Sequence, residues 1–519
     1  MPQFVRRVRP PLRFIPTAYN PWIMRAVLWA LPFLLRVRIR PWLPAGIRRI
    51  EVENVDRLVD LYAELEAGKS RFLMAVRHVE VDDPLSGLYL CSRAVQRAAK
   101  ARGIQLRQPV HTHFIYERGM TIWAGKGLGW LLSRMGGTPI RRGRRPDWVG
   151  LKAARKLMVE GEMPLVVAPE GATNGHSERL GPLEPGVAQM GFWCAEDLQR
   201  AGRAEQVQIL PIGLQYRYVT PHWTKLETLL SQLEKQSGLD VSKWATGERS
   251  AELERASENA SERTSERASE RTSERTSERA SGKVCHQRIL RLGVHLMEKM
   301  EAFYTRYYHQ SFPAKKKEED KPAIAPLPPQ EKTAVEASTP IGTQDASERL
   351  KALLNRALQV SEQFFNLPEK GTLEGRCRRI EEASWNYIYR EDLPEISTLS
   401  PLDRGLADWA AQAASMRELH MRMVESFVAV NGDYLNEKPS FERCAETTLL
   451  ISDMLARLSG DKLPGRPRLG DRWVKMTVQP PISISPRLAD YQQSRRAGRA
   501  AVAAVTEEIR QALESSIER

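Results

Sequence analysis

The chain has 519 residues, of which 42% are hydrophobic and 27% are charged, and its formal net charge at pH 7 is +14. This length exceeds the roughly 250–300 residues at which one hydrophobic core stops growing, so we expect at least two packed units. The composition excludes a collagen-like, wholly disordered or polytopic membrane chain. The five cysteines form no CxxC pair, which supports neither a zinc ribbon nor a disulfide framework.

The first 50 residues are basic and contain a short apolar stretch. Residues 1–50 carry ten arginines and no acidic residue, and Pro21 to Leu35 is apolar apart from Arg25 and includes Trp22 and Trp29. The stretch is shorter than the roughly 20 residues of a spanning helix, and its arginine flanks and tryptophans are typical of a helix in the headgroup layer of an anionic membrane. We therefore expect residues 1–50 to be a basic amphipathic membrane-associating segment of a peripheral or monotopic protein on the cytoplasmic face. A core helix with a solvated basic tail is the alternative, and an organelle transit peptide stays open.

Residues 51–220 alternate apolar runs with amphipathic stretches. The expected strands cover residues 71–77, 110–115, 164–168 and 208–213, and the expected helices cover residues 84–99, 148–159 and 187–201. Strands that alternate with helices in this way predict an α/β unit whose sheet is flanked by helices.

After residue 220 the alternation ends. We interpret residues 221–345 as a low-complexity and linker insertion with one helix, because they contain a Ser-Glu-Arg repeat at 257–281, a helical stretch at 284–308 and a Pro-rich run. Residues 346–470 contain long segments with a 3.6-residue period, which predicts an inserted all-helical bundle.

The last segment, residues 471–519, changes pattern again. It contains an expected strand at 473–478 and an expected helix at 486–515. Because a lone strand is not stable in water, we expect this segment to complete the sheet of residues 51–220.

One pair of residues at the end of the first expected strand could carry out chemistry. His78 and Asp83 form an HxxxxD motif. An imidazole can accept a hydroxyl proton at neutral pH, and a carboxylate on its other ring nitrogen fixes the tautomer and stabilises the imidazolium. The motif alone is a weak signal, and in the alternative interpretation Asp83 only caps the following helix.

Three further motif blocks also stand at expected strand ends. They are residues 136–142 with Arg141 and Arg142, residues 167–174 with Glu170, Gly171 and Thr173, and residues 209–214. In order and spacing across about residues 55–218, the four blocks resemble those of the HxxxxD glycerolipid acyltransferases, typified by 1-acylglycerol-3-phosphate acyltransferase.

This resemblance implies a fold, a reaction and a set of site residues. The fold is a mixed central sheet flanked by helices, and the reaction is transfer of a fatty acyl group from acyl carrier protein or coenzyme A to a lysolipid in phospholipid biosynthesis. His78 is the implied general base and Asp83 the group that orients it. The implied substrate-binding residues are Arg141, Arg142, Glu170, Gly171 and Thr173. We expect an anionic membrane surface as a partner, no nucleic acid, no metal and no cofactor beyond the acyl thioester.

The chain also departs from the family pattern. Arg77 precedes the histidine where the family usually has Asn, Glu80 replaces Ser, and Ala172-Thr173 stands where Thr-Arg is common. One phosphate-binding arginine is therefore missing, and Arg141 replaces an acidic residue. The acceptor can be 1-acylglycerol-3-phosphate or a different lysolipid. The alternative from another class is a non-catalytic lipid-binding scaffold on the same fold.

Overall fold

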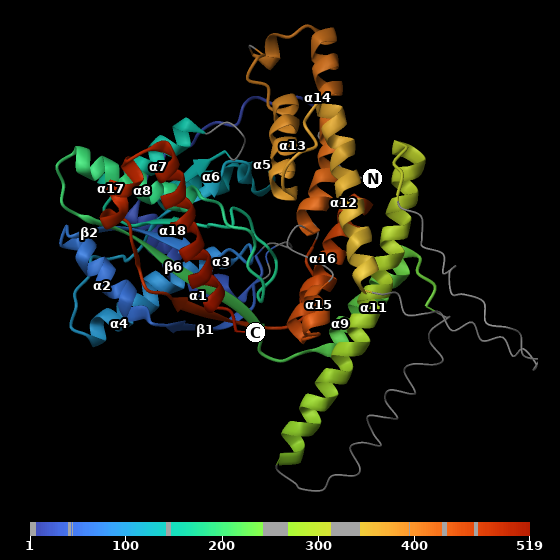
Figure 1. Ribbon diagram of the computed structural model, residues 1–519, viewed down its shortest axis with the longest axis horizontal. Helices are drawn as coiled ribbons and strands as arrows, with labels where there is room; N and C mark the ends of the chain where they lie inside the picture. The colour runs from blue at the N-terminus through green and yellow to red at the C-terminus, as the bar shows by residue number, and fades with distance from the viewer. Residues whose placement is uncertain are drawn as a thin grey trace, which may run out of the picture.

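The computed structural model describes residues 7–39, 43, 45–141, 147–241, 268–312, 343–393, 395–427, 433–460 and 465–518. Figure 1 shows two units side by side. We call the sheet together with helices α1 to α8, α17 and α18 the α/β unit, and we call α9 and α11 to α16 the helical unit. The expected fold class, a mixed sheet flanked by helices with an inserted helical region, is confirmed.

The described residues form an eight-stranded sheet. In spatial order its strands are β1 (Ile47–Glu53), β7 (Arg472–Val478), β6 (Gln206–Tyr218), β2 (Ser70–Val76), β5 (Leu165–Val167), β3 (His113–Glu117) and β4 (Gly137–Ile140), with β8 (Ile482–Ser483) paired to β6. From β6 to β4 the strands are parallel, whereas β7 is antiparallel to β6 and parallel to β1. The sheet is therefore mixed.

Helices cover both faces of this sheet because side chains alternate along each strand. In β2, Phe72 and Met74 pack into one core, and Leu73 and Ala75 pack into the other. The first core is covered by α1 (Pro21–Arg36), α2 (Val55–Glu66) and the continuous helix formed by α3 (Asp83–Tyr89), the π-helical turn η1 (Leu90–Val95) and α4 (Gln96–Ala101). The second is covered by α7 (Trp148–Glu160), α8 (Gly186–Arg200), α17 (Leu488–Gln492) and α18 (Arg495–Ser515). The short helices α5 (Met120–Ala124) and α6 (Lys126–Arg134) connect β3 to β4.

The N-terminal segment packs against both units of the protein, which its basic composition does not indicate. The side chain of Asn20 caps α1, whose inner stripe, including Met24 and Leu31, is buried in the core of the α/β unit. Before α1, the backbone of Val8 donates a hydrogen bond to Asp408 of the helical unit. Strand β1 starts at Ile47, so the sheet begins before the expected division at residue 50. None of the described helices is long and apolar enough to span a membrane.

The chain leaves the sheet after β6 and returns to it at β7. Arg472 to Val478 pair in antiparallel register with Tyr218 to Ile212 of β6, and the same strand pairs with β1 on its other side. The apolar face of α18 then covers the second core. Without β7, both β6 and β1 would have an unpaired edge over this stretch.

The helical unit lies between these two strands in sequence. It consists of α9 (Trp223–Ser237), α11 (Ala268–Tyr308), α12 (Thr343–Phe365), α13 (Leu373–Ile388), α14 (Pro401–Phe427), α15 (Asp433–Glu437) and α16 (Phe441–Ser459). The interpretation of residues 257–281 as a linker is wrong from Ala268 onward, because this part begins the long helix α11, and residues 257–267 lie outside the described residues. Residues 221–345 also contain α9, whose leucines pack against α11 and α16. The packed part of α11 nucleates the helix, and Glu, Arg and Ala favour its extension.

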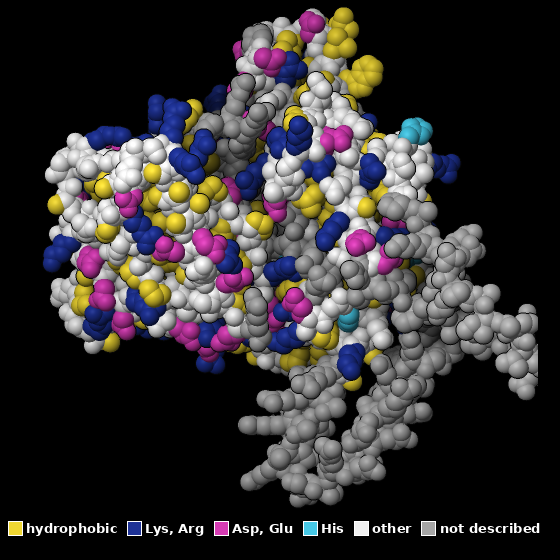
Figure 2. All heavy atoms as spheres, in the orientation of Figure 1, with side chains coloured by type: hydrophobic (Ala, Val, Ile, Leu, Met, Phe, Trp, Pro, Cys, Tyr) yellow, Lys and Arg dark blue, Asp and Glu magenta, His cyan; other side chains and the backbone are white. Residues whose placement is uncertain are grey.

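Charge is mixed over the surface of the α/β unit. Figure 2 shows basic and acidic side chains interspersed on the face turned to the viewer. The formal charge of +14 is therefore not gathered into one patch on this face.

Candidate active site

The candidate site lies at the carboxyl edge of the parallel strands. His78 follows β2, and Glu170 follows the neighbouring strand β5. In α/β sheets this edge is where ligands bind, because the loops after adjacent strands meet there. The backbone of Asn174 donates to the carbonyl of His78, and that of Gly175 donates to the carbonyl of Val79, so the loop after β5 lies against the HxxxxD turn.

His78 and Asp83 are in direct contact. The distance from His78 Nδ1 to Asp83 Oδ2 is 2.9 Å, and the His78 side chain is 28% exposed whereas that of Asp83 is 5% exposed. A carboxylate only accepts hydrogen bonds, so Nδ1 carries the ring hydrogen and Nε2 has the lone pair. This imidazole can accept a proton at Nε2.

Asp83 does not act as a simple helix cap. Its Oδ2 accepts hydrogen bonds from the backbone N–H groups of Val79 at 2.6 Å and Glu80 at 3.0 Å, and its Oδ1 accepts one from the hydroxyl of Tyr216 at 2.7 Å. The N-cap position of α3 is Asp82, one residue earlier than expected. The Asp83 carboxylate instead closes the turn that carries His78.

Tyr216 reaches Asp83 because β6 is longer than β2. Ser70 to Val76 pair with Gln206 to Ile212, and the rest of β6 continues past the end of β2. Burial, followed by the charge of Asp83, raises the pKa of the Tyr216 phenol well above its usual value. Sequence analysis missed this residue, although it lies two positions beyond the last motif block.

Glu170 supports the loop after β5. Its Oε2 accepts from the backbone of His78 at 2.9 Å, and its Oε1 accepts from the backbone of Gly181 at 2.8 Å and the amide of Asn174 at 2.5 Å. Burial raises the pKa of this carboxyl group, an effect opposed by the charge of Arg77. Glu170 thus positions the backbone of His78. The neighbouring Gly171 has a φ of +73°, which favours glycine, and Thr173 is exposed.

Arg77, the departure from the family pattern, is a buried structural residue. Its guanidinium group donates to the carbonyls of Leu214, His176, Ser177 and Arg179, at distances from 2.5 to 3.1 Å. Burial lowers the pKa of this arginine. Arg77 therefore joins β6 to the loop after Glu170 directly beside His78.

The closing segment of the chain contributes two arginines to the same turn. Arg472 of β7 donates to Asp82 Oδ2 at 2.6 Å, and its charged group lies 4.5 Å from the ring centre of Tyr216. Arg466 forms a close ion pair with Glu80, the second departure from the family pattern. The HxxxxD turn is therefore held by residues almost 400 positions later, which the local motif could not reveal.

Of the two predicted substrate-binding arginines, Arg141 is among the described residues. Arg141 follows β4, where it donates to Asn386 at 2.9 Å and pairs with Glu391 of the helical unit at 3.2 Å. Arg142 lies outside the described residues. Within the described part of the chain, no group of three or more His, Cys, Asp and Glu side chains could hold a metal ion.

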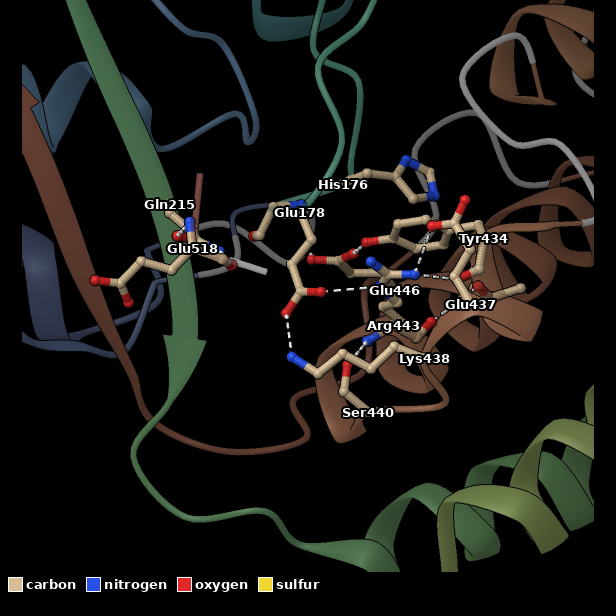
Figure 3. A network of polar contacts seen from close by, with 12 residues as sticks. His176, Glu178, Gln215, Tyr434, Glu437, Lys438, Ser440, Arg443, Glu446 and Glu518 are labelled. Atoms are coloured by element: carbon tan, nitrogen blue, oxygen red, sulfur yellow. Dashed lines mark hydrogen bonds and ion pairs between the residues drawn. The ribbon is translucent and has the colours of Figure 1, made fainter. Parts of the chain in front are cut away.

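A buried network joins the loop after β5 to the helical unit (Figure 3). Glu446 of α16 accepts from the backbone of Ser177 at 2.9 Å and from the hydroxyl of Tyr434 at 2.6 Å. Arg443 donates to Glu178 at 2.8 Å. Burial raises the pKa of Glu446 to about 7. The loop that Arg77 holds is thus in contact with both units.

Comparison with known proteins agrees with this geometry. Residues 98–215 match the model of a family described as Acyltransferase, a stretch that includes β3, β4, β5 and most of β6. The matched stretch begins after the His78–Asp83 turn and ends before Tyr216. No curated protein and no solved structure matches the chain. Residues 98–215 of the α/β unit are therefore similar to the acyltransferase family, which supports a general acyltransferase activity.

Proposed function

We propose that this protein transfers a fatty acyl group from an acyl thioester, carried by acyl carrier protein or coenzyme A, to a hydroxyl group of a lysolipid. The observation that carries the proposal is the 2.9 Å contact between His78 Nδ1 and Asp83 Oδ2 at the carboxyl edge of the sheet. The imidazole is 28% exposed, and Nε2 is the ring nitrogen that would take the substrate proton.

The proposed reaction proceeds by general base catalysis. His78 Nε2 takes the proton of the acceptor hydroxyl as its oxygen attacks the thioester carbonyl carbon. The new ester C–O bond forms, the C–S bond breaks, and the departing sulfur receives the proton from the imidazolium. Asp83 remains ionised and stabilises the imidazolium, while the backbone N–H groups and Tyr216 keep the carboxylate in place.

We propose 1-acylglycerol-3-phosphate as the acceptor, on the basis of the family resemblance. Arg141 is engaged by the helical unit, so the phosphate contact falls to Arg142 and the exposed Thr173. Transfer from a labelled acyl thioester to a panel of lysolipids tests this acceptor. Faster transfer to a lysolipid with another headgroup would exclude it and leave the reaction class intact.

The decisive variant is His78→Ala. We expect it to lower kcat by about 10² to 10⁴ or more, because general base assistance is lost. Its midpoint of thermal unfolding should fall by only a few degrees, since Asp83 loses one hydrogen bond and keeps those from Val79, Glu80 and Tyr216. His309→Ala, an exposed histidine of the helical unit, is the matched control and should keep full activity. Full activity of purified His78→Ala would exclude the catalytic role, and lysolipid binding without any turnover in the native protein would favour a non-catalytic scaffold.

We further propose that the outer face of α1 contacts anionic membranes. Trp22, Trp29 and Phe33 are 73%, 85% and 57% exposed, and the guanidinium group of Arg25 lies 4.9 Å from the ring centre of Trp22. Aromatic rings beside arginines suit the lipid headgroup layer.

Because the inner face of α1 is part of the core, substitution tests this surface better than truncation does. Replacing Trp22, Trp29 and Phe33 by Ser should weaken binding to anionic vesicles, because these side chains can no longer insert between the lipids. The control replaces Leu402, Leu406 and Trp409 of α14, which are also exposed, by Ser. Binding of the native protein should also fall as salt rises. Equal vesicle binding by both triple variants would refute the assignment.

A further inference from the structure

The helical unit contains a partly open apolar cavity that the acyltransferase chemistry does not use. Its volume is about 160 Å³, and it lies between α11, α12, α14, α15 and α16. Aliphatic side chains and four methionines make up most of its wall, among them Met297, Leu354, Met423 and Ile451. Methionine is flexible and polarizable, so such a wall adapts to ligands of different length.

The cavity wall offers no charge to a ligand. Among the described residues that line it there is no Asp, Glu, Lys or Arg, and only His286, Tyr304, Tyr434 and Thr447 have polar side-chain atoms. Three of these four use their hydroxyl groups within the protein: Tyr304 pairs with His420 at 2.8 Å, Tyr434 donates to Glu446 at 2.6 Å, and Thr447 donates to the carbonyl of Arg443 at 2.8 Å. His286 is hydrogen-bonded to Asn436, and burial lowers its pKa, which favours the neutral ring.

We propose that this cavity binds the hydrocarbon chain of a lipid. A polar or charged ligand would lose its hydration and gain no partner there, whereas an alkyl chain has no such cost. The volume is close to that of an engineered apolar cavity of roughly 150 Å³ that stays dry and admits benzene, so it accommodates a segment of a fatty acyl chain. The inference rests on the proposed function for its ligand class, because the acyl thioester and the lysolipid both carry such a chain.

The position of Tyr434 connects this cavity to the candidate active site. One side of Tyr434 lines the cavity, and its ring lies edge-on against that of His176, with 5.0 Å between the ring centres. Tyr434 and the backbone of Ser177 bind the two oxygens of the same Glu446 carboxylate. In Figure 3 Tyr434, Glu446 and His176 lie together at the boundary between the helical unit and the loop after β5.

Arg77 links the loop that Tyr434 contacts to His78. The carbonyls of His176 and Ser177 accept hydrogen bonds from Arg77 at 2.7 and 2.6 Å, and Arg77 immediately precedes His78. A hydrocarbon chain that packs against Tyr434 therefore supports the loop that positions the HxxxxD turn.

The cavity can be filled at a glycine. Gly293 of α11 lines it, and a Cβ atom added there would have no heavy atom within 4 Å. Gly405 of α14 is the matched control, because it is also helical, has no heavy atom within 4 Å of an added Cβ, and does not line the cavity. Gly293→Leu fills part of the space, and Ala357→Leu does so from α12.

The test uses the full chain and a long-chain fatty acid with a photoreactive diazirine near its methyl end. After illumination, we expect saturable labelling of cavity peptides from α11, α12 and α16. Gly293→Leu and Ala357→Leu should each weaken this labelling by about ten-fold, whereas Gly405→Leu should label like the native protein. Far-UV circular dichroism of each variant shows whether its helices are intact.

Competition separates the two possible sources of the chain. Loss of labelling with a non-hydrolysable acyl thioester indicates a donor chain, and loss with 1-acylglycerol-3-phosphate indicates an acceptor chain. Either result supports the proposal. Absence of label from the cavity peptides, or cavity labelling that is unchanged in the folded Gly293→Leu and Ala357→Leu proteins, would overturn it.

The same assay with His78→Ala distinguishes this inference from the proposed function. Cavity labelling should be equal to that of the native protein, because His78 does not line the cavity. If no acyl transfer is found and the cavity still labels, the catalytic proposal fails and the lipid site stands. If transfer is found and the cavity does not label, the reverse holds.

Discussion

The α/β unit buries polar and charged side chains at the carboxyl edge of its sheet, whereas the helical unit buries mainly apolar side chains around its cavity. At the carboxyl edge of the sheet, Asp83, Glu170 and Arg77 are buried and each makes several hydrogen bonds. The helical unit surrounds its cavity with aliphatic side chains and directs its few polar atoms away from it. Buried, hydrogen-bonded side chains therefore hold the HxxxxD turn in one geometry, whereas the apolar cavity has room for a flexible hydrocarbon chain.

Each unit also contains a buried ion pair, which allows a direct test of this contrast. Asp82 and Arg472 pair at 2.6 Å beside the HxxxxD turn, and Glu362 and Arg376 pair at 2.7 Å between α12 and α13. Both carboxylates are fully buried. The two pairs are similarly buried. The Asp82–Arg472 pair adjoins the HxxxxD turn, whereas the Glu362–Arg376 pair lies within the helical unit.

The largest expected effect is that of breaking these pairs. Arg472→Met and Arg376→Met should each lower the free energy of unfolding by about 3–5 kcal/mol, because each removes the closest cation from a buried carboxylate. Only Arg472→Met should also lower kcat in the folded protein, since Asp82 adjoins Asp83. Denaturant unfolding and kcat, both measured at low temperature, provide the comparison.

A double variant serves as the control for this prediction. Asp82→Asn combined with Arg472→Met removes both charges and should recover much of the lost stability. An equal fall in kcat for Arg376→Met would show that the helical unit controls the active site through its overall stability and would contradict the contrast.

The next largest effect is expected at Tyr216. Tyr216→Phe removes the hydrogen bond to Asp83 Oδ1 and should lower the free energy of unfolding by about 1.5–3 kcal/mol, the usual range for a bond to a charged group. The Asp83 carboxylate would be less well fixed, so kcat should fall while KM for the acyl thioester stays close to its native value. A change in KM alone would indicate that Tyr216 contacts a substrate.

A pH-dependent effect is expected at the boundary between the units. Burial raises the pKa of Glu446 to about 7, above its ordinary value of 4.5. The folded protein therefore retains a proton that the unfolded chain releases between about pH 4.5 and 7, and stability contributed by this group falls as pH rises through that window. Glu446→Gln should thus gain stability relative to the native protein between pH 5 and 8, by on the order of 2 kcal/mol.

The measurement for Glu446 is urea unfolding of both proteins at several pH values. Other titrating groups, including buried His176, are common to the two proteins, so the difference isolates Glu446. A difference that is constant with pH would contradict the raised pKa.

The smallest effect is expected at the cavity wall. Gly293→Ala and Gly405→Ala should both raise the free energy of unfolding, by about 0.5–1 kcal/mol, because alanine favours a helix more than glycine does. Gly213→Ala in β6 should do the opposite, since its Cβ atom would lie 1.9 Å from Ser516 Oγ. Differential scanning calorimetry can show whether each variant is more or less stable than the native protein. A destabilised Gly293→Ala protein would mean that no free space adjoins Gly293.

Much of the α/β unit was predictable from local pattern. The expected strands at 71–77, 164–168 and 208–213 overlap β2, β5 and β6, and the expected helices at 148–159 and 187–201 overlap α7 and α8. The strands are apolar runs because both of their faces are buried, and the helices show a 3.6-residue hydrophobic period because one of their faces is buried. The HxxxxD spacing likewise placed His78 and Asp83 across one strand-to-helix turn, where the structure brings them into contact.

Other assignments failed because the deciding partner is remote in sequence. Composition indicated a linker at residues 257–281, yet from Ala268 onward the chain continues into a helix that packs further along against α9 and α16. The support that Glu170 gives to the backbone of His78 and Gly181 could not be predicted either, because both partners lie in other segments of the chain. Tyr216 and Arg472 carried no local signal for their role at Asp83 and Asp82.

Local sequence spacing was sufficient to predict the α/β alternation, the HxxxxD pair and the amphipathic character of α1, because each depends on residues that are close together in the chain. Three features follow only from the packing of distant segments: β7 joins β6 to β1, Arg472 reaches Asp82, and the helical unit contains an apolar cavity beside Tyr434. Strand pairing and cavity shape depend on the free energy gained when segments that are distant in sequence pack together and exclude water. That free energy arises from packing between elements and is not contained in the pattern of any one of them.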